Sequence, residues 1–411
     1  MFTATANLVL PSTVTGSWPR PRWFDMSLWG RRLDTCMLDV HFREKFQDAL
    51  AVVISDQARA GLDILTHGDY HCDEDFAGRS WHHYPLQRWT GFEGDYLQSE
   101  ETISPWLRYP PGTLLNEIYT GWRWPRVVGR IGHRDLDYPK IWRLAQARTA
   151  RPVRFGTCCS QVMGLFLDRH TDHYRRDGRR GGGDDFDAKR QVYWDMAEAM
   201  NTELLALRNA GCRCIQIEEP TLHFMANTYG PDDDRVRFLV DCYNREVQGL
   251  DDVEIWIHTC WGNPNMQRVI EDTRYAASLE MYLHECRGDV WALEMADRDF
   301  REIELFAAFK DALPKKICIG AVSHRTLQAD RAEDVAGRIR LALRHIRPED
   351  LIVSSDCGFG RQGCNREIAF FKATAIAQGC NIVRSELGLP VTEVRGANPE
   401  LQTDIVAAGR D

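Results

Sequence analysis

The chain has 411 residues, of which 44% are hydrophobic and 27% are charged, and its net charge is −9. This composition is typical of a soluble globular protein, and the negative charge argues against a non-specific binder of nucleic acid or anionic membranes. No apolar stretch approaches the ~20 residues that a bilayer span needs, and the N-terminus has no basic segment followed by a long apolar core. We therefore expect a cytoplasmic protein with small-molecule partners, no nucleic acid and no membrane. A homo-oligomer is compatible with the sequence.

The chain contains 13 cysteines. Their number is odd, their spacing is irregular and no CxxC pair occurs, which favours reduced thiols over a disulfide framework. Most are expected to pack in the core, so a functional cysteine has to be argued from its position.

Short apolar or β-branched segments recur along the chain and end in polar or glycine-containing turns. The eight predicted strands are 13–19, 63–69, 152–158, 214–220, 254–260, 289–295, 316–322 and 351–358. Helical patterns lie between them, including 41–61, 188–211 and 332–351, and the helix in the last of these is expected to end before Pro348. This alternation predicts an α/β fold, a (β/α)₈ TIM barrel, as a single catalytic domain over residues 1–411. An open doubly wound sheet would usually carry a glycine-rich phosphate loop after its first strand, and none is present.

Two segments interrupt the repeat. Residues 70–150 form a long insertion after the second strand, rich in Trp, His and Tyr, in which a small hairpin is expected around 126–133. Residues 175–187 combine three consecutive glycines with dense charge, which predicts a mobile loop above the barrel mouth. A solvated linker without function is the alternative for this second segment.

Ligand-type side chains stand at the ends of three predicted strands. His258 and Cys260 end one strand and share a face, Glu294 ends the next, and Cys357 ends the last. Catalytic groups of a barrel lie at the carboxyl ends of its strands, and we expect these three strands to be neighbours. Two sulfurs, one nitrogen and one oxygen suit Zn²⁺. A lone histidine or cysteine is more often a packing residue, but four together argue against coincidence.

Six motifs carry a family resemblance: "GSWP", "HGDY", "IQIEEP", "HTCWGN", "DVWALE" and "DCG". In this order they resemble the C-terminal catalytic domain of cobalamin-independent methionine synthase, a barrel enzyme that uses zinc to methylate homocysteine sulfur. The related epoxyalkane:coenzyme M transferases use a similar zinc site. The resemblance implies that His258, Cys260, Glu294 and Cys357 are the zinc ligands, and we expect Glu294 to be the one that is displaced.

The resemblance also implies substrate-binding residues. In the family two carboxylates hold the homocysteine amino group and a serine helps to bind its carboxylate, which here correspond to Asp69, Glu218 and Ser17. Asp and Glu are exchanged relative to the usual pattern, but both anions remain, which favours an aminothiol over a sulfonate thiol. The family's catalytic histidine aligns with Arg325, one position after His324. We predict His324 as the proton donor to the leaving group.

The family's tryptophan-serine segment that contacts folate is replaced by "GTCCSQ", so the predicted donor is not a folate polyglutamate. The predicted function is a zinc-dependent thiol S-methyl or alkyltransferase, most specifically a short methionine-synthase-like enzyme. The alternative is an epoxyalkane:thiol transferase or related C–S lyase with the same zinc site. A decarboxylase resembling uroporphyrinogen decarboxylase would lack zinc and need a basic cleft, and a zinc-storing protein would have a closed site.

Overall fold

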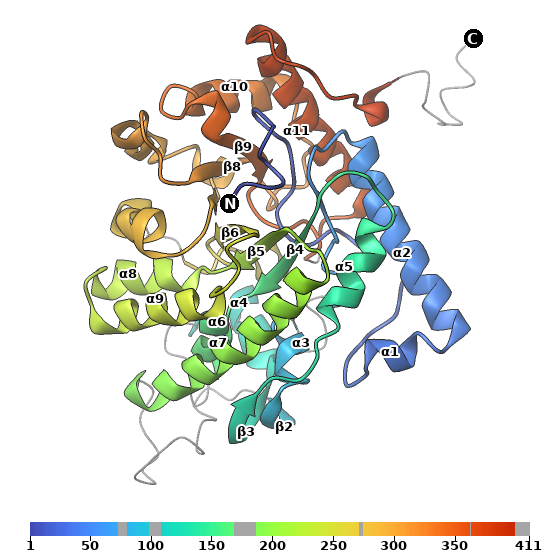
Figure 1. The fold of residues 1–411 in the computed structure, drawn as a ribbon, viewed down its shortest axis with the longest axis vertical. Helices are drawn as coiled ribbons and strands as arrows, with labels where there is room; N and C mark the ends of the chain where they lie inside the picture. Colours follow the sequence, from blue (N-terminus) through green and yellow to red (C-terminus); the bar gives the residue numbers. More distant parts are fainter. Residues whose placement is uncertain (73–79, 98–107, 168–185, 271–273, 362, 399–411) are drawn as a thin grey trace.

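A curled parallel sheet forms the centre of the molecule (Figure 1). The computed structural model describes residues 1–72, 80–97, 108–167, 186–270, 274–361 and 363–398. Its seven parallel strands pair in the order β1-β4-β5-β6-β7-β8-β9. They are β1 (Leu65–Thr66), β4 (Val153–Cys158), β5 (Cys214–Glu218), β6 (Glu254–Thr259), β7 (Val290–Leu293), β8 (Lys316–Val322) and β9 (Leu351–Ser355). Every residue in them is buried, as a sheet covered on both faces requires.

The first predicted strand, 13–19, is not a regular strand, so the prediction of eight strands was wrong by one. Ser12 forms an isolated parallel bridge with Val353, while the backbone N–H of Ile64 donates to the Ser12 carbonyl at 3.1 Å. The segment therefore joins β9 to the chain just before β1. Pro11 and Pro19 lack the N–H that a ladder needs, and Gly16 has a φ of +68°, so extended pairing cannot continue. The α/β class and the barrel-type parallel sheet are confirmed.

Helices surround the sheet (Figure 1). Those predicted from apolar spacing form as α2 (Val40–Arg59), α7 (Phe186–Asn209) and α10 (Ala332–Ala342). The last was predicted to end before Pro348; it ends at Ala342 and is followed by a 3₁₀ turn at Pro348–Asp350. The other described α-helices are α1 (Leu33–Cys36), α3 (His83–Leu86), α4 (Leu114–Gly121), α5 (Tyr138–Gln146), α6 (Ser160–Phe166), α8 (Thr221–Tyr229), α9 (Asp234–Glu246) and α11 (Arg366–Glu386).

Either side of β7, the connections use 3₁₀ and π turns in place of long α-helices. They are Pro264–Met266, Tyr275–Ala277 and the π turn Met281–Glu285 before β7, and Ala296–Arg298 and Ile303–Phe309 after it.

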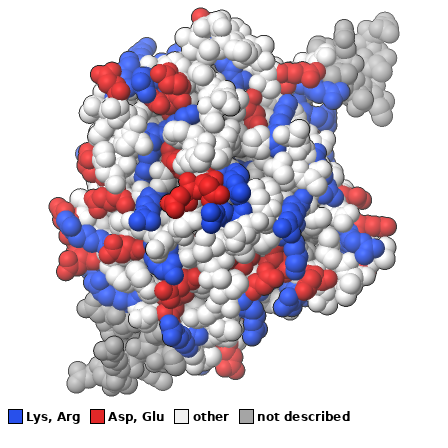
Figure 2. Space-filling model, in the orientation of Figure 1, with Lys and Arg blue, Asp and Glu red and all other residues white. Residues whose placement is uncertain are grey.

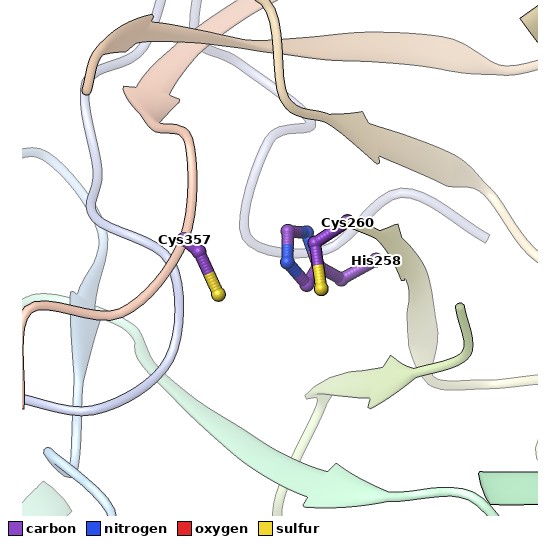
Figure 3. A group of neighbouring side chains, drawn as sticks. All are labelled: His258, Cys260 and Cys357. Atoms are coloured by element: carbon purple, nitrogen blue, oxygen red, sulfur yellow. The ribbon is translucent and has the colours of Figure 1, made fainter. Parts of the chain in front are cut away.

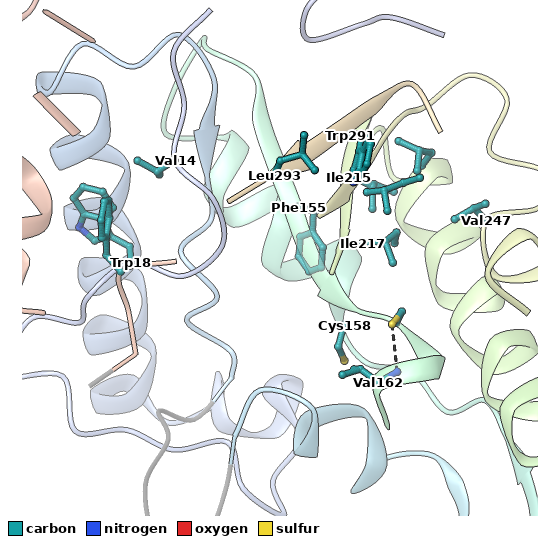
Figure 4. Packing of buried hydrophobic residues seen from close by; sticks show 14 of the residues in the cluster. Val14, Trp18, Phe155, Cys158, Val162, Ile215, Ile217, Val247, Trp291 and Leu293 are labelled. Atoms are coloured by element: carbon teal, nitrogen blue, oxygen red, sulfur yellow. Dashed lines mark hydrogen bonds between the residues drawn. The ribbon is translucent and has the colours of Figure 1, made fainter. Parts of the chain in front are cut away.

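The core has two parts. Between sheet and helices pack large side chains such as Phe155, Ile215 and Trp291 (Figure 4). Inside the curl a smaller cluster contains Trp256, together with Ala4 of the N-terminal segment. The side chain of Lys316 also donates to the Thr5 carbonyl at 2.9 Å. The N-terminal segment therefore packs inside the sheet, and the carboxyl ends of the strands are the edge on which a site can be built.

The insertion 70–150 contains the expected hairpin, formed by β2 (Thr90–Leu97) and β3 (Arg123–Gly132) in antiparallel pairing. Its last part is helix α5, which packs against β4, α2 and α7 and so belongs to the helices around the sheet. Of the predicted glycine-rich loop, residues 175–185 lie outside the described residues, and Phe186 and Asp187 begin α7.

Acidic and basic side chains are interspersed on the face shown in Figure 2. Among the helices that the structure describes, none has the length and hydropathy needed to cross a bilayer.

Candidate functional site

Three ligand-type side chains converge at the carboxyl edge of the sheet. His258 is the fifth residue of β6, Cys260 follows that strand, and Cys357 lies two residues beyond β9. Ligand atoms of all three lie within 4.8 Å of one another and the three residues are buried (Figure 3). Glu294, His324 and Cys357 form a second group of the same compactness, so Cys357 belongs to both.

The expected strand neighbourhood needs one correction. β8 lies between β7 and β9, so the strands that carry Glu294 and Cys357 are not adjacent. The curl of the sheet still brings their ends together, because loops after successive strands face one mouth. The segment that follows the intervening strand β8 contributes His324 and Arg325 to the same place.

The chemistry of these donors fits a zinc-type ion. Contact with the Cys260 thiol is the largest cause that lowers the pKa of Cys357, and contact with His258 adds to it. The same thiol contact, with burial, raises the pKa of Cys260. Neither ring nitrogen of His258 has a well-formed hydrogen bond among the described residues, although buried polar atoms normally have one. Two sulfurs and an unsatisfied imidazole are a donor set for Zn²⁺.

Glu294 is fully buried and held by Arg325. Nη2 of Arg325 donates to both carboxylate oxygens, at 2.9 and 3.1 Å. Burial raises the pKa of Glu294 to about 8, against the opposing effect of the Arg325 charge. Arg325 also donates through Nε to Asp297 at 2.8 Å and through Nη2 to the Gly262 carbonyl at 2.9 Å.

His324 is completely buried, and neither ring nitrogen has a hydrogen-bond partner among the described residues. Its Nε2 lies 3.9 Å from Oε1 of Glu294. Burial lowers the pKa of His324 well below its usual value, with the Arg325 charge acting in the same direction. The ring is therefore neutral in this environment.

The two carboxylates predicted to bind an ammonium group line one small cavity of about 240 Å³, counted with its space open to solvent, together with Tyr138 and Cys158. Burial, then the charge of Glu218, raises the pKa of Asp69 to about 8, and burial also raises that of Glu218. Oδ1 of Asp69 lies 3.4 Å from Nε2 of His67 but accepts no hydrogen bond among the described residues. A buried cation between these two groups would relieve the cost of their charges.

Ser17 lies against the loop that carries Cys357. Its hydroxyl accepts from the backbone N–H of Gly360 at 3.2 Å. A Cβ at Gly358 would meet the Ser17 nitrogen at 2.6 Å, so glycine is required for this close approach. The structure thus brings Ser17 to the mouth, although it lines neither the small cavity nor the larger one described next.

A larger cavity of about 950 Å³, counted with its space open to solvent, adjoins the sulfur pair. Cys260, Cys357 and Glu218 line its inner side, and Glu218 lines the small cavity as well. Aromatic side chains form much of the rest, among them Trp81, Tyr119, Trp122 and Phe224. The first three come from the insertion, which therefore forms part of the wall of this cavity.

Sequence reasoning missed two features. One is the double contact of Arg325 with Glu294. The sequence pointed to Arg325 only because it aligns with the family's catalytic histidine. The other is Asp356, whose carboxylate accepts from the backbone N–H groups of Met295, Ala296 and Asp297 at 2.7 to 2.9 Å. Its place beside Cys357 in "SSDCG" was the available signal.

Comparisons with known proteins agree with the motifs. Residues 178–377 match the family model described as "Cobalamin-independent synthase, Catalytic domain". Curated methionine synthases of Sulfurisphaera tokodaii and Saccharolobus solfataricus are 24% and 25% identical, over 92% of this chain and 94% and 96% of theirs. The resemblance to the cobalamin-independent methionine synthase family is therefore confirmed.

Solved structures show the same fold. A B12-independent methionine synthase from Shewanella sp. W3-18-1, in complex with selenomethionine, gives a TM-score of 0.70 at 20% identity, over 92% of this chain and 99% of that one. A putative vitamin-B12 independent methionine synthase from Listeria monocytogenes gives 0.59 at 16% identity, with the same coverage.

Proposed function

We propose that this chain, whose residues 178–377 match the model of the cobalamin-independent synthase catalytic domain, is a zinc-dependent methyltransferase acting on a thiol. The observation that carries the proposal is the convergence of His258, Cys260 and Cys357 at the carboxyl edge of the sheet. The three hold the ion, and Glu294 is its fourth, exchangeable ligand. An oxygen donor is the least committed partner of zinc beside two thiolates.

Zinc, when bound, favours loss of the proton from a thiol whose pKa is ordinarily near ~8.5, and so supplies a sulfur nucleophile at neutral pH. The protein's own groups keep that sulfur in a buried place beside two cysteines and an imidazole. Burial excludes water and strengthens the local electrostatic interactions.

The acceptor is an aminothiol, with homocysteine as the most specific candidate. Asp69 and Glu218 bind its ammonium group, since both are buried carboxylates on one cavity and Glu218 also faces the cysteines. Ser17 helps to bind its carboxylate end. The Shewanella protein of the same fold forms a complex with selenomethionine, an amino acid with a methylated chalcogen, which supports this assignment.

The methyl or alkyl donor enters the larger cavity, where Trp81, Tyr119 and Trp122 offer surfaces for stacking or apolar packing. We propose a donor other than a folate polyglutamate, because "GTCCSQ" replaces the folate-contacting segment. As the sulfur attacks the methyl carbon, the bond to the leaving group breaks and its electrons stay with that group. His324 is proposed to carry to that group the proton that the thiol releases on binding, so its ring is protonated only in passing.

A thiol panel tests the acceptor. Zinc-loaded protein is titrated with homocysteine, cysteine, coenzyme M and glutathione, and Asp69→Asn is measured beside the wild type. Homocysteine should bind most tightly, and Asp69→Asn should weaken it by about tenfold or more, as loss of a charged hydrogen bond does, while zinc content is unchanged.

Preference for coenzyme M, or an Asp69→Asn variant that binds homocysteine as well as the wild type, would contradict the aminothiol assignment. The alternative prediction, an epoxide-opening thiol enzyme, is tested by supplying an epoxide with the preferred thiol and analysing the products for a thioether.

A further inference from the structure

We propose that Arg325 is a positioning residue that binds the carboxylate of Glu294 when it leaves the metal and thereby favours its replacement by the substrate thiolate. This inference rests on the proposed function, and it assigns to Arg325 the control of the exchange of Glu294.

The contacts of Arg325 leave its guanidinium little freedom. Nη2 binds both oxygens of Glu294, Nε binds Asp297, and the Gly262 carbonyl accepts a further hydrogen bond. The side chain of Arg325 is 9% exposed and that of Glu294 is completely buried. Such a buried pair is weakly screened and has a defined geometry.

The backbone around Glu294 is fixed, so only its side chain can move. Asp356 accepts from the backbone N–H groups of Met295, Ala296 and Asp297. The Glu294 carbonyl in turn accepts from the Tyr275 hydroxyl at 3.0 Å. A Glu294 carboxylate oxygen already lies within 4.8 Å of the Cys357 sulfur, so a change of side-chain rotamer is enough to bring it to an ion beside that sulfur.

The charges at the metal site explain how Arg325 can favour the substrate thiolate over Glu294. Zn²⁺ with two cysteine thiolates has no net charge, and every further anionic ligand adds a negative charge to a buried site, which is costly. The substrate thiolate and the Glu294 carboxylate therefore compete for the ion. A guanidinium that binds the carboxylate favours the thiolate, because the displaced charge stays paired.

A double-mutant cycle tests this. Zinc dissociation constants are measured by chelator competition, without thiol, for the wild type, Arg325→Gln, Glu294→Gln and the double variant. Arg325→Gln frees the carboxylate, so zinc should bind about tenfold more tightly, a size typical of changes to groups that orient metal ligands. The effect should disappear when Glu294 is Gln. Homocysteine should then need a higher concentration to change the metal spectrum of Arg325→Gln.

Arg268→Gln is the matched control. Arg268 pairs at 2.5 Å with Asp297, which Arg325 also binds. The zinc affinity of Arg268→Gln should equal that of the wild type. If Arg325→Gln fails to fold by circular dichroism, Arg325→Lys replaces it, because an ammonium cannot bind Glu294 and Asp297 in this forked geometry.

Unchanged or weaker zinc binding in the Arg325 variant, or tightening that persists without Glu294, would overturn the inference. The two proposals fail in different ways. A wild type that neither binds zinc nor responds to homocysteine would remove the proposed function. A wild type that does both, with no coupling between Arg325 and Glu294, would remove the role of Arg325 alone.

Discussion

Cys357 is the side chain shared by both ligand-type groups at the mouth of the sheet. Its pKa is lowered mainly by contact with Cys260. A thiolate is the form of cysteine that binds metals, so Cys357 is the member of the pair best prepared to do so before any ion arrives.

Replacing Cys357 by Ser should remove most bound zinc, because one sulfur of a three-residue set is lost. Zinc per chain is measured by elemental analysis after gel filtration. Cys364→Ser is the matched control, since Cys364 is buried in the same loop region but lies in neither ligand group. Full zinc retention in Cys357→Ser would exclude Cys357 as a ligand.

For single residues, the sequence predicted which side chains converge at the carboxyl edge of the sheet, but not all of their contacts. His258, Cys260 and Cys357 could be predicted because strand ends and side-chain alternation determine where they lie. The hold of Arg325 on Glu294 could not, because it depends on rotamers and on loop paths after two different strands. His324 was chosen from that loop for catalysis, and this role stays a prediction.

The first turn of helix α6 depends on a buried carboxylate at the end of α9. The backbone N–H and the hydroxyl of Ser160 both donate to Oε2 of Glu246, at 2.9 and 2.7 Å. Burial raises the pKa of Glu246 from 4.5 to about 8. Between these pH values the folded protein keeps a proton that the unfolded chain has released, so its stability falls as pH rises.

Glu246→Gln should therefore lose less stability between about pH 5 and about pH 9 than the wild type, by on the order of a few kcal/mol. The free energy of unfolding is measured by denaturant titration at both pH values. The exposed Glu304→Gln is the control, with the wild-type pH dependence expected. Equal slopes in Glu246→Gln and the wild type would show that this carboxyl does not titrate as described.

Helices whose apolar residues recur at regular helical spacing were predictable. Segments in which proline or glycine interrupts the pattern were not. Helices α2 and α7 agree within two residues at their starts and at their ends. The strand 13–19 was predicted from its β-branched and apolar residues, but Gly16 and Pro19, with Pro11 just before the segment, prevent regular pairing. The helix predicted to run from 332 to the residue before Pro348 was too long, because the apolar spacing continues past Ala342, where the α-helix ends.

For the molecule as a whole, the alternation of strands and helices was enough to predict a barrel-type parallel sheet. The arrangement of the insertion was not predictable, because its aromatic residues could equally pack against each other or face solvent. In the structure Trp122 and Trp124 are buried, and Trp81, Tyr119 and Trp122 line the cavity beside the cysteines. The insertion thus contributes to the cavity proposed for the donor.

The sulfur count at zinc tests the central claim most directly. Zinc-edge X-ray absorption is recorded on the purified protein before and after homocysteine is added. The proposed function predicts two sulfur ligands in the free protein and three in the complex, with the oxygen contribution reduced. Protein that stays metal-free under zinc supplementation, or a sulfur count that does not change with homocysteine, would contradict it.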